Sequence, residues 1–474
     1  MDQNLKKKVD SYKDDIINSL QEIVQVKSVE TQAQEGMPFG EGVDRSLRRF
    51  LEIANDLGLK TKYVDGYAGH VEIGEGEETL GILCHLDVVP EGTGWTYPPY
   101  EAEIHDNKMY GRGTIDDKGP AVASLYALKA IEDSDINLNK RVRLILGTDE
   151  ESGWEGLEYY FKKEFKPEIA FSPDAQYPVI HAEKGILIFD LNYEFESYEE
   201  NYLDKNNYKY EVLFLKGGNA PNMVPDNCEL LIKTDYGKAL EKKLADFKNK
   251  TDYDIKLNKE GKNKYKLISG GVSAHGSMPE KGKNAISRLM AFIAELDKVN
   301  IQEFVDFYNN NIGLDYYGER IGCNLEDEVS GNLIFNVGQI NFTENLIKTT
   351  VNIRYPVTKN KNEVLEGIKN EVGQYDVYLE MKNHQEPLYV PKDDSLVQNL
   401  MEVYRKVTGD NDSEPIAIGG GTYARAVPKG VAFGALFPGE EELAHQKDEY
   451  IDIENLQKNA LIIASAIKAL AAEK

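Results

Sequence analysis

Three short apolar segments in the first half of the chain run directly into acidic or imidazole side chains. The segments, each with the residues that follow it, are Thr79–Cys84 with His85 and Asp87, Arg141–Thr148 with Asp149-Glu150-Glu151, and Glu168–Ser172 with Asp174. Runs of this kind are typical of strands buried on both faces of a sheet. Open α/β sheets bind ligands at the carboxyl ends of such strands. The pattern therefore predicts a sheet with one polar, ligand-binding edge.

A further pair of acids precedes a helix. Asp116 and Asp117 follow Gly111-Arg-Gly-Thr-Ile and lead into a helix predicted to begin near Ala121, with Pro120 at its first turn. One acid is enough to cap a helix, so the other is available for a different role. Strand–loop units that alternate with helices predict an α/β domain, a mostly parallel sheet with helices on both faces.

The sequence pattern changes at Gly185 and changes back near Tyr389. The intervening residues alternate in long strand-like segments with helices between them, which predicts an α+β region. Short buried strands and loops then resume. An inserted domain explains this order, so we expect residues 1–184 and 386–474 to form one domain and residues 185–385 to be inserted into it.

Charge and composition exclude several classes of partner. The net charge is −26, and the chain has no basic run beyond Lys6-Lys7-Lys8, so neither nucleic acid nor an anionic membrane is an expected partner. The most apolar helix, residues 455–472, is too short and too amphipathic to span a bilayer. Three widely spaced cysteines and an N-terminus without an apolar signal core predict a cytoplasmic protein.

The candidate residues suit a divalent metal site. On its own, His85 beside Asp87 is equally consistent with a core histidine next to a helix cap. A set of two histidines and three carboxylates, however, is what divalent cations of hard or borderline character prefer. If Asp116 bridges two ions, Glu151 and His445 complete one ligand set and His85 and Asp174 the other. Glu150 is then free to act as a general base toward a bridging water.

Other catalytic motifs are absent from the sequence. It contains no Gly-x-Ser-x-Gly elbow, and Gly419–Thr422 lacks the Lys-Ser/Thr of a phosphate-binding loop. No Gly-x-Gly-x-x-Gly opens a helix after a strand. His70, His105 and His384 lie in strand patterns without acidic motifs and are interpreted as structural.

Five motifs in order resemble a known family. They are His85-Leu-Asp87-Val-Val-Pro, Gly111-Arg-Gly-Thr-Ile-Asp116-Asp-Lys-Gly, Asp149-Glu-Glu151-Ser-Gly, Ser172-Pro-Asp174 and the late His445. Together they are similar to those of the co-catalytic dizinc metallopeptidase superfamily, which includes aminoacylases, glutamate carboxypeptidases and carnosinases. Within it the chain resembles peptidase V-type dipeptidases over essentially its whole length.

The resemblance implies a role for each matching position. The implied metal ligands are His85, Asp116, Glu151, Asp174 and His445, for two divalent ions, zinc in the first place and manganese or cobalt as alternatives. Glu150 is implied as general base, and Asp87 as the carboxylate that orients His85. The Asp116–Asp117 peptide bond is expected to be cis. The α/β domain is then the catalytic domain and the inserted domain a lid. In the lid, His275 matches the residue that polarises the scissile carbonyl. Substrate-binding positions are matched by Asn222, Arg354, Gly420, Gly421, Thr422 and Arg425.

Two details of the resemblance refine the expected activity. In this superfamily an Asp at the position of Asp174 accompanies aminopeptidase or dipeptidase action, whereas a Glu accompanies carboxypeptidases and aminoacylases. A lid of this length resembles the version that supplies His275 within one chain, which implies a monomer. We therefore expect a metal-dependent dipeptidase acting on small unblocked dipeptides. The alternative is an N-acyl-amino-acid deacylase or related amidase of the same superfamily.

Overall fold

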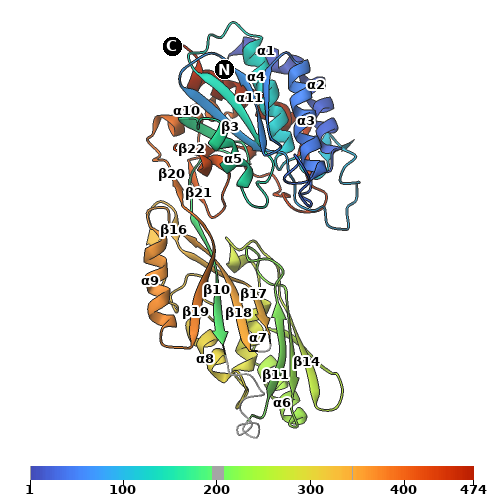
Figure 1. The fold of residues 1–474 in the computed structure, drawn as a ribbon, viewed down its shortest axis with the longest axis vertical. Helices are drawn as coiled ribbons and strands as arrows, with labels where there is room; N and C mark the ends of the chain where they lie inside the picture. The colour runs from blue at the N-terminus through green and yellow to red at the C-terminus, as the bar shows by residue number, and fades with distance from the viewer. Residues whose placement is uncertain (1, 195–207, 344, 474) are drawn as a thin grey trace. The chain divides into compact units, whose positions relative to one another are not determined.

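The chain folds into two compact units. The computed structural model describes residues 2–194, 208–343 and 345–473. Unit 1 comprises residues 1–182 and 388–474, and unit 2 comprises residues 183–387 (Figure 1). The predicted domain boundaries, after residues 184 and 385, each fall two residues from the boundaries of these units.

Unit 1 combines helices and short strands. Its helices are α1 (Gln3–Ser11), α2 (Lys13–Val24), α3 (Glu41–Asp56), α4 (Lys118–Glu132), α5 (Glu155–Lys163), α10 (Ser395–Thr408) and α11 (Ile453–Ala471), with the 3-10 turn η2 (Tyr423–Ala426). Its strands are β1 (Lys60–Val64), β2 (Ala68–Ile73), β3 (Thr79–His85), β4 (Glu103–His105), β5 (Lys108–Tyr110), β6 (Arg141–Gly147), β7 (Ile169–Ser172), β8 (Ala175–Gln176), β9 (Ile180–Glu183), β20 (Leu388–Tyr389), β21 (Ile416–Ile418), β22 (Gly430–Ala432), β23 (Ala435–Leu436) and β24 (Tyr450–Asp452).

The main sheet of unit 1 is parallel at its centre. Its order is β1-β2-β6-β3-β7-β22-β9-β20, with β21 pairing to β9. The pairs β6–β3, β3–β7 and β7–β22 are parallel, whereas β1–β2, β2–β6 and β22–β9 are antiparallel. The α/β class is thus confirmed, with parallel pairing among the four central strands β6, β3, β7 and β22. Every residue of β3 is buried, as its apolar run predicts.

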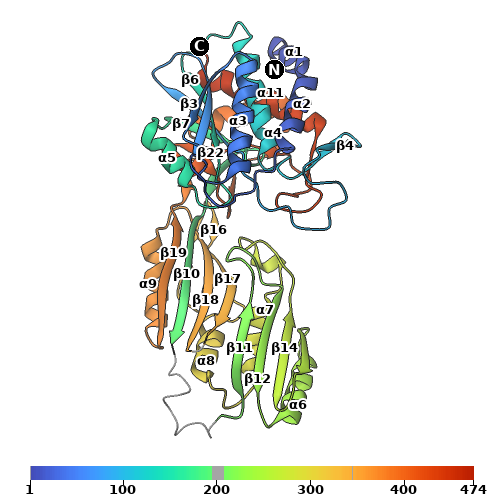
Figure 2. The same cartoon turned by 45° about the vertical axis from the view of Figure 1, so that its right-hand side comes forward.

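Both faces of this sheet are covered. On one face, Leu80, Ile82 and Cys84 of β3 pack in a cluster with residues of α1–α4, α10 and α11. On the other, Leu83 joins Leu157 and Tyr160 of α5 in a smaller cluster. Figures 1 and 2 show α4 and α11 side by side near β3. Asp452 begins α11 by accepting hydrogen bonds from the backbone N–H groups of Glu454 and Asn455.

Unit 2 has an α+β architecture. Its strands are β10 (Gly185–Glu194), β11 (Glu211–Gly217), β12 (Asn227–Lys233), β13 (Asp254–Lys259), β14 (Lys264–Gly270), β15 (Glu326–Asp327), β16 (Gly331–Asn332), β17 (Ile334–Phe342), β18 (Leu346–Tyr355) and β19 (Val377–Gln385). Its helices are α6 (Gly237–Lys248), α7 (Ala285–Ile293), α8 (Gln302–Asn311) and α9 (Lys361–Val372), with the 3-10 turn η1 (Pro279–Lys281).

An antiparallel sheet forms the centre of unit 2. Eight strands run in the order β13-β14-β12-β11-β17-β18-β10-β19. Alternate residues such as Leu187, Phe189 and Leu191 of β10 enter a cluster that includes residues of α6–α9, and Figure 2 shows these helices gathered on one face of the sheet. A two-residue period and one helix-covered face explain the alternation seen in the sequence. Among the described residues, no helix is long and apolar enough to cross a membrane.

Candidate metal centre

The end of β3 places His85 in a buried position. Its side chain is 1% exposed. Nδ1 lies 2.9 Å from the carbonyl oxygen of Asp87, and Nε2 lies 2.9 Å from Oδ1 of Asp116. The hydrogen bond to a carbonyl makes Nδ1 the protonated nitrogen, which leaves Nε2 available as a ligand atom.

Two groups of potential ligand atoms meet at Asp116. His85, Asp116 and Asp174 form one group, and Asp116, Glu151 and His445 form the other; in each, the ligand atoms lie within 4.8 Å of one another. Asp116 directs Oδ1 toward His85 and Oδ2 toward His445, whose Nε2 lies 3.0 Å away. Nε2 of His445 is also 2.8 Å from Oε1 of Glu151, and Nε2 of His85 is 3.8 Å from Oδ2 of Asp174. The five predicted ligand residues are therefore brought together, in the division the sequence suggested.

Asp87 acts mainly on a neighbouring loop. Its carboxylate accepts hydrogen bonds from the backbone N–H groups of Glu150 and Glu151, at 3.1 and 3.0 Å. The shortest contact to Nδ1 of His85 comes from the Asp87 carbonyl, while the carboxylate oxygen Oδ1 lies at 3.5 Å. Asp87 thus orients His85 chiefly through its backbone and uses its carboxylate to hold the Glu150–Glu151 loop.

The three consecutive acids have different environments. Asp149 turns away from the ligand groups and accepts a hydrogen bond from the Gly156 N–H in the first turn of α5. The Glu150 carbonyl accepts from the indole N–H of Trp154 at 2.9 Å. Glu151 alone contacts His445. The backbone of Glu150 is therefore held at both its N–H and its carbonyl, and its side chain belongs to neither ligand group.

The cluster carries excess negative charge. Burial and the neighbouring Asp116 raise the pKa of Glu151 to about 7 and that of Asp174 to about 6. Burial and the charge of Asp174 raise the pKa of Glu150 well above its usual value. Burial opposes ionisation of Asp116 too, but hydrogen bonds from His445 and His85 lower its pKa. The side chain of His445 is half exposed; its partial desolvation disfavours the charged form, yet Asp116 and Glu151 raise its pKa to about 11. These carboxylates thus require nearby positive charge.

Divalent cations fit this arrangement. Each group offers one imidazole nitrogen and two carboxylates, a donor set that zinc, manganese and cobalt all accept. The opposite oxygens of Asp116 face the two groups, as a bridging ligand requires. The Asp116–Asp117 peptide bond is cis, as expected.

The glycine-rich loop lies beside His85. Tyr423, which directly follows Thr422, is buried, and its ring centroid lies 6.3 Å from that of His85. The Thr422 hydroxyl accepts from the Ala424 N–H, and the Arg425 guanidinium donates to the Gly420 carbonyl at 2.7 Å. An added Cβ at Gly421 would lie 3.0 Å from the guanidinium carbon of Arg425, so a larger residue there would require the Arg425 side chain to shift. The loop is a compact turn closed by Arg425.

The remaining predicted residues belong to unit 2. The Gly276 N–H donates to the Asn222 carbonyl at 2.7 Å, and Met223 pairs with His275, so Asn222 and His275 lie on neighbouring segments. Nδ1 of His275 lies 2.6 Å from the Ser277 hydroxyl. On β18, Nε of Arg354 donates to Oδ1 of Asn352 at 2.9 Å. Asn336 of β17 lies opposite Asn352 of β18. The side-chain amide of Asn336 donates to the carbonyls of Pro221 and Met223, the residues on either side of Asn222.

Two acids missed by the sequence reasoning support the ligand groups. The Asp117 carboxylate accepts from the backbone N–H of His85 at 3.1 Å. Glu449 accepts from several backbone N–H groups of the Asp116 loop. The adjacency of Asp117 to Asp116 offered a weak signal, whereas Glu449 appeared as one acid among many.

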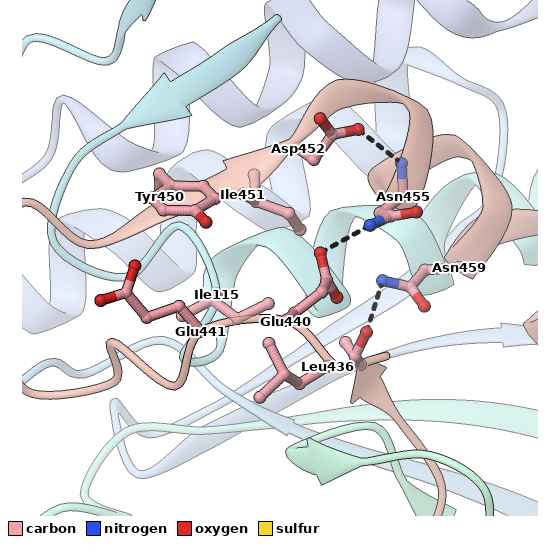
Figure 3. Close-up of a pocket in the computed structure, with 10 residues that line it drawn as sticks. Ile115, Leu436, Glu440, Glu441, Tyr450, Ile451, Asp452, Asn455 and Asn459 are labelled. Atoms are coloured by element: carbon pink, nitrogen blue, oxygen red, sulfur yellow. Dashed lines mark hydrogen bonds between the residues drawn. The ribbon is translucent and has the colours of Figure 1, made fainter. Parts of the chain in front are cut away.

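A small cavity lies near Ile115 but is separate from the ligand groups (Figure 3). It measures about 10 Å³, room for about one water molecule, so it does not accommodate a peptide. Two of the side chains that line it make hydrogen bonds that Figure 3 marks: Asn455 donates to Glu440, and Asn459 donates to the Ala435 carbonyl.

Comparison with known proteins supports the predicted resemblance. The chain is 40% identical over 464 residues to "Putative dipeptidase YtjP" of Bacillus subtilis (strain 168), covering 97% of this chain and 98% of the relative. It is 39% identical over 484 residues to "Putative dipeptidase SAB1611c" of Staphylococcus aureus (strain bovine RF122 / ET3-1), covering 99% of this chain and 100% of the relative.

Solved structures share the fold. Human carnosine dipeptidase 1 matches with a TM-score of 0.55 at 15% identity, over 98% of this chain and 99% of that one. The dipeptidase Dug1p of Saccharomyces cerevisiae matches with a TM-score of 0.58 at 13% identity, over 98% of each chain. The model of peptidase family M20/M25/M40 matches residues 81–469. The resemblance read from the five motifs is thereby confirmed, and the chain belongs to peptidase family M20/M25/M40.

Proposed function

We propose that the protein is a metal-dependent dipeptidase that hydrolyses unblocked dipeptides. The observation that carries this proposal is the shared carboxylate of Asp116, whose two oxygens face two separate groups of histidine and carboxylate ligands. Relatives that match nearly the whole chain are named as dipeptidases, which supports the substrate class.

Two divalent ions are the proposed cofactors, zinc first and manganese or cobalt as alternatives. His85 and Asp174 would hold one ion, Glu151 and His445 the other, and Asp116 both. Bound there, the ions would supply Lewis-acid polarisation of the scissile carbonyl and a lowered pKa for water. Within the chain, Asp87 fixes the loop that carries Glu151 by accepting its backbone N–H.

Glu150 is the proposed general base. Two backbone hydrogen bonds fix its position, and its side chain lies outside both ligand groups. Its carboxylate would accept a proton from the attacking water and deliver that proton to the departing amine. Neutralising the base without changing its shape, as in Glu150→Gln, should therefore lower kcat strongly and leave metal binding intact.

Residues of unit 2 and the glycine-rich loop are the proposed substrate contacts. We assign stabilisation of the oxyanion to His275, and recognition of the substrate to Asn222, Arg354, Gly420, Gly421, Thr422 and Arg425. A clamp on the free carboxylate would limit substrates to about two residues. In keeping with this, His275→Ala should lower kcat without lowering metal content. A loss of metal would instead make His275 a ligand.

We further propose that the protein is a cytoplasmic monomer, and that its substrate is a small molecule rather than nucleic acid or a membrane surface. The deciding experiment compares hydrolysis of an unblocked dipeptide with that of its N-acetylated analogue, in the presence of zinc, manganese or cobalt. Faster hydrolysis of the unblocked peptide supports a dipeptidase. Preference for the acetylated compound would instead identify an N-acyl-amino-acid deacylase.

A further inference from the structure

Glu449 is a buried acid that joins two distant parts of the candidate metal centre. It is 0% exposed and lies four residues after His445. Its Oε1 accepts from the backbone N–H groups of Gly113 and Ile115, at 2.9 and 3.0 Å. The same oxygen lies 3.4 Å from the backbone nitrogen of Asp116. Its Oε2 accepts from Arg112 at 2.5 Å.

The backbone around Glu449 strengthens this connection. The Glu449 carbonyl accepts from the Gly111 N–H at 2.9 Å, and the following strand β24 pairs with β5, which leads into the Asp116 loop. Side chain and main chain therefore bind the same loop. The two residues that Glu449 connects in this way, His445 and Asp116, are in contact: Nε2 of His445 lies 3.0 Å from Oδ2 of Asp116.

The contacts of Glu449 indicate that it holds the Asp116 loop in place and is not itself a metal ligand. Both carboxylate oxygens of Glu449 are occupied by donors, and Glu449 belongs to neither ligand group. Arg112 is 1% exposed and places one positive charge beside it. Carboxylates that accept several backbone N–H groups hold a loop in one conformation, because each bond constrains a different peptide unit.

We propose that Glu449 is a positioning residue for the metal centre, setting the separation between Asp116 and His445. This inference rests on the proposed metal site. Residues that support ligands in this way typically affect metal affinity by about 10–100-fold. Glu449 acts through Asp116 and His445 and has no proposed contact with substrate.

The test measures metal affinity of the full-length holoenzyme by competition with a chelator, together with kcat and KM on an unblocked dipeptide. Glu449→Gln should weaken retention of at least one ion by about 10–100-fold. Saturating metal should then restore kcat to within a few-fold of wild type, because the catalytic groups themselves are unchanged. KM should change little.

Glu164→Gln is the matched control. Glu164 is a largely buried acid of unit 1 that pairs with buried Arg143 at 3.1 Å and hydrogen-bonds to none of the ligand residues. Its variant should lose thermal stability and keep wild-type metal affinity. Metal affinity of Glu449→Gln within twofold of wild type, with only a stability loss like that of the control, would overturn the proposal.

A second variant covers the case in which Glu449→Gln does not fold. Arg112→Lys keeps a positive charge beside Glu449 and removes the planar guanidinium, so metal affinity should fall, by less than in Glu449→Gln. Unchanged affinity would overturn the proposal. If wild-type protein binds both ions and leaves dipeptides intact, the proposed function fails and the Glu449 inference is still decided by metal affinity. If wild-type protein binds no divalent ion, both fail.

Discussion

Unit 1 contains two clusters of histidine and charged side chains that differ in charge balance. Around His70, Arg143 pairs with both Glu72 and Glu164, and Tyr160 lies 2.9 Å from Nδ1 of the imidazole. Arg141 also pairs with Glu72, and Lys62 also pairs with Glu164. Around His85, the ligand groups contain three carboxylates and two histidines. Within the described part of the chain, none of these five side chains forms an ion pair with a lysine or arginine. The first cluster is balanced by its own side chains, whereas the second requires added positive charge.

The state of each histidine reflects this difference. Burial, with the charge of Arg143 adding to it, lowers the pKa of His70 to about 3, so this imidazole is neutral, with Nδ1 2.9 Å from the Tyr160 hydroxyl. Acidic partners instead raise the pKa of His445, whose side chain is half exposed, to about 11 against its partial desolvation. A balanced cluster stabilises the fold as it stands. An unbalanced one marks the place where a cation would bind.

The largest expected effect separates Glu150 from its neighbour. Glu150→Gln removes the proposed base and should lower kcat by about 10³-fold, with metal content unchanged. Asp149→Asn is the control, because Asp149 caps α5 and should affect stability with kcat within a few-fold. Steady-state kinetics and metal analysis of both variants check this. Equal losses of kcat would show that the two acids do not differ in role.

Asp116 tests the unbalanced cluster directly. Asp116→Asn removes one negative charge shared by both ligand groups, so affinity for divalent ions should fall by about 100-fold or more. Glu72→Gln removes one negative charge from the cluster around His70 and should leave metal affinity as in wild type. Competition with a chelator measures both. Equal affinity in wild type and Asp116→Asn would contradict the bridging role.

Metal removal should destabilise unit 1 in particular. An ion present at about 100 times its Kd stabilises the folded state by about 2.7 kcal/mol, and chelation removes this contribution. The ligand groups all lie in unit 1. Hydrogen exchange with and without chelator should therefore show faster exchange at β3 and α5 and little change at β17 and β18. A uniform change over both units would contradict this expectation.

The smallest expected effect concerns the balanced cluster. The folded-state pKa of His70, about 3, lies below its unfolded value of about 6.5, so the unfolded chain binds the extra proton. The contribution is present above pH 6.5 and is lost as pH falls toward 3, amounting to about 2 kcal/mol between pH 7 and pH 5. His70→Gln should flatten this part of the stability–pH curve, measured by denaturant unfolding. An unchanged slope would contradict a neutral, buried His70.

Most of the candidate ligand residues could be predicted from the sequence, because each of them follows a recognisable strand or loop pattern. His85, Glu151 and Asp174 were found at the ends of apolar runs, and Asp116 before a helix. The role of Asp87 was only partly foreseen, because a sequence does not show whether a carbonyl or a carboxylate lies nearer an imidazole. Glu449 was missed, since an acceptor of backbone N–H groups needs no motif and the chain has 81 acidic residues. The antiparallel strands flanking the sheet were also missed, because a local pattern carries no strand direction.

Local sequence patterns were enough to identify the chemistry: apolar runs that must be buried, and a set of acids and histidines placed where those runs end. Which of these side chains meet depends on the three-dimensional packing of the chain. Glu151 and His445 are 294 positions apart and lie 2.8 Å from each other, and Glu449 reaches the Asp116 loop from the same late segment. Contacts at such separations depend on how helices and strands pack, because hydrophobic burial is non-directional and each hydrogen bond forms only after the chain has brought its partners together.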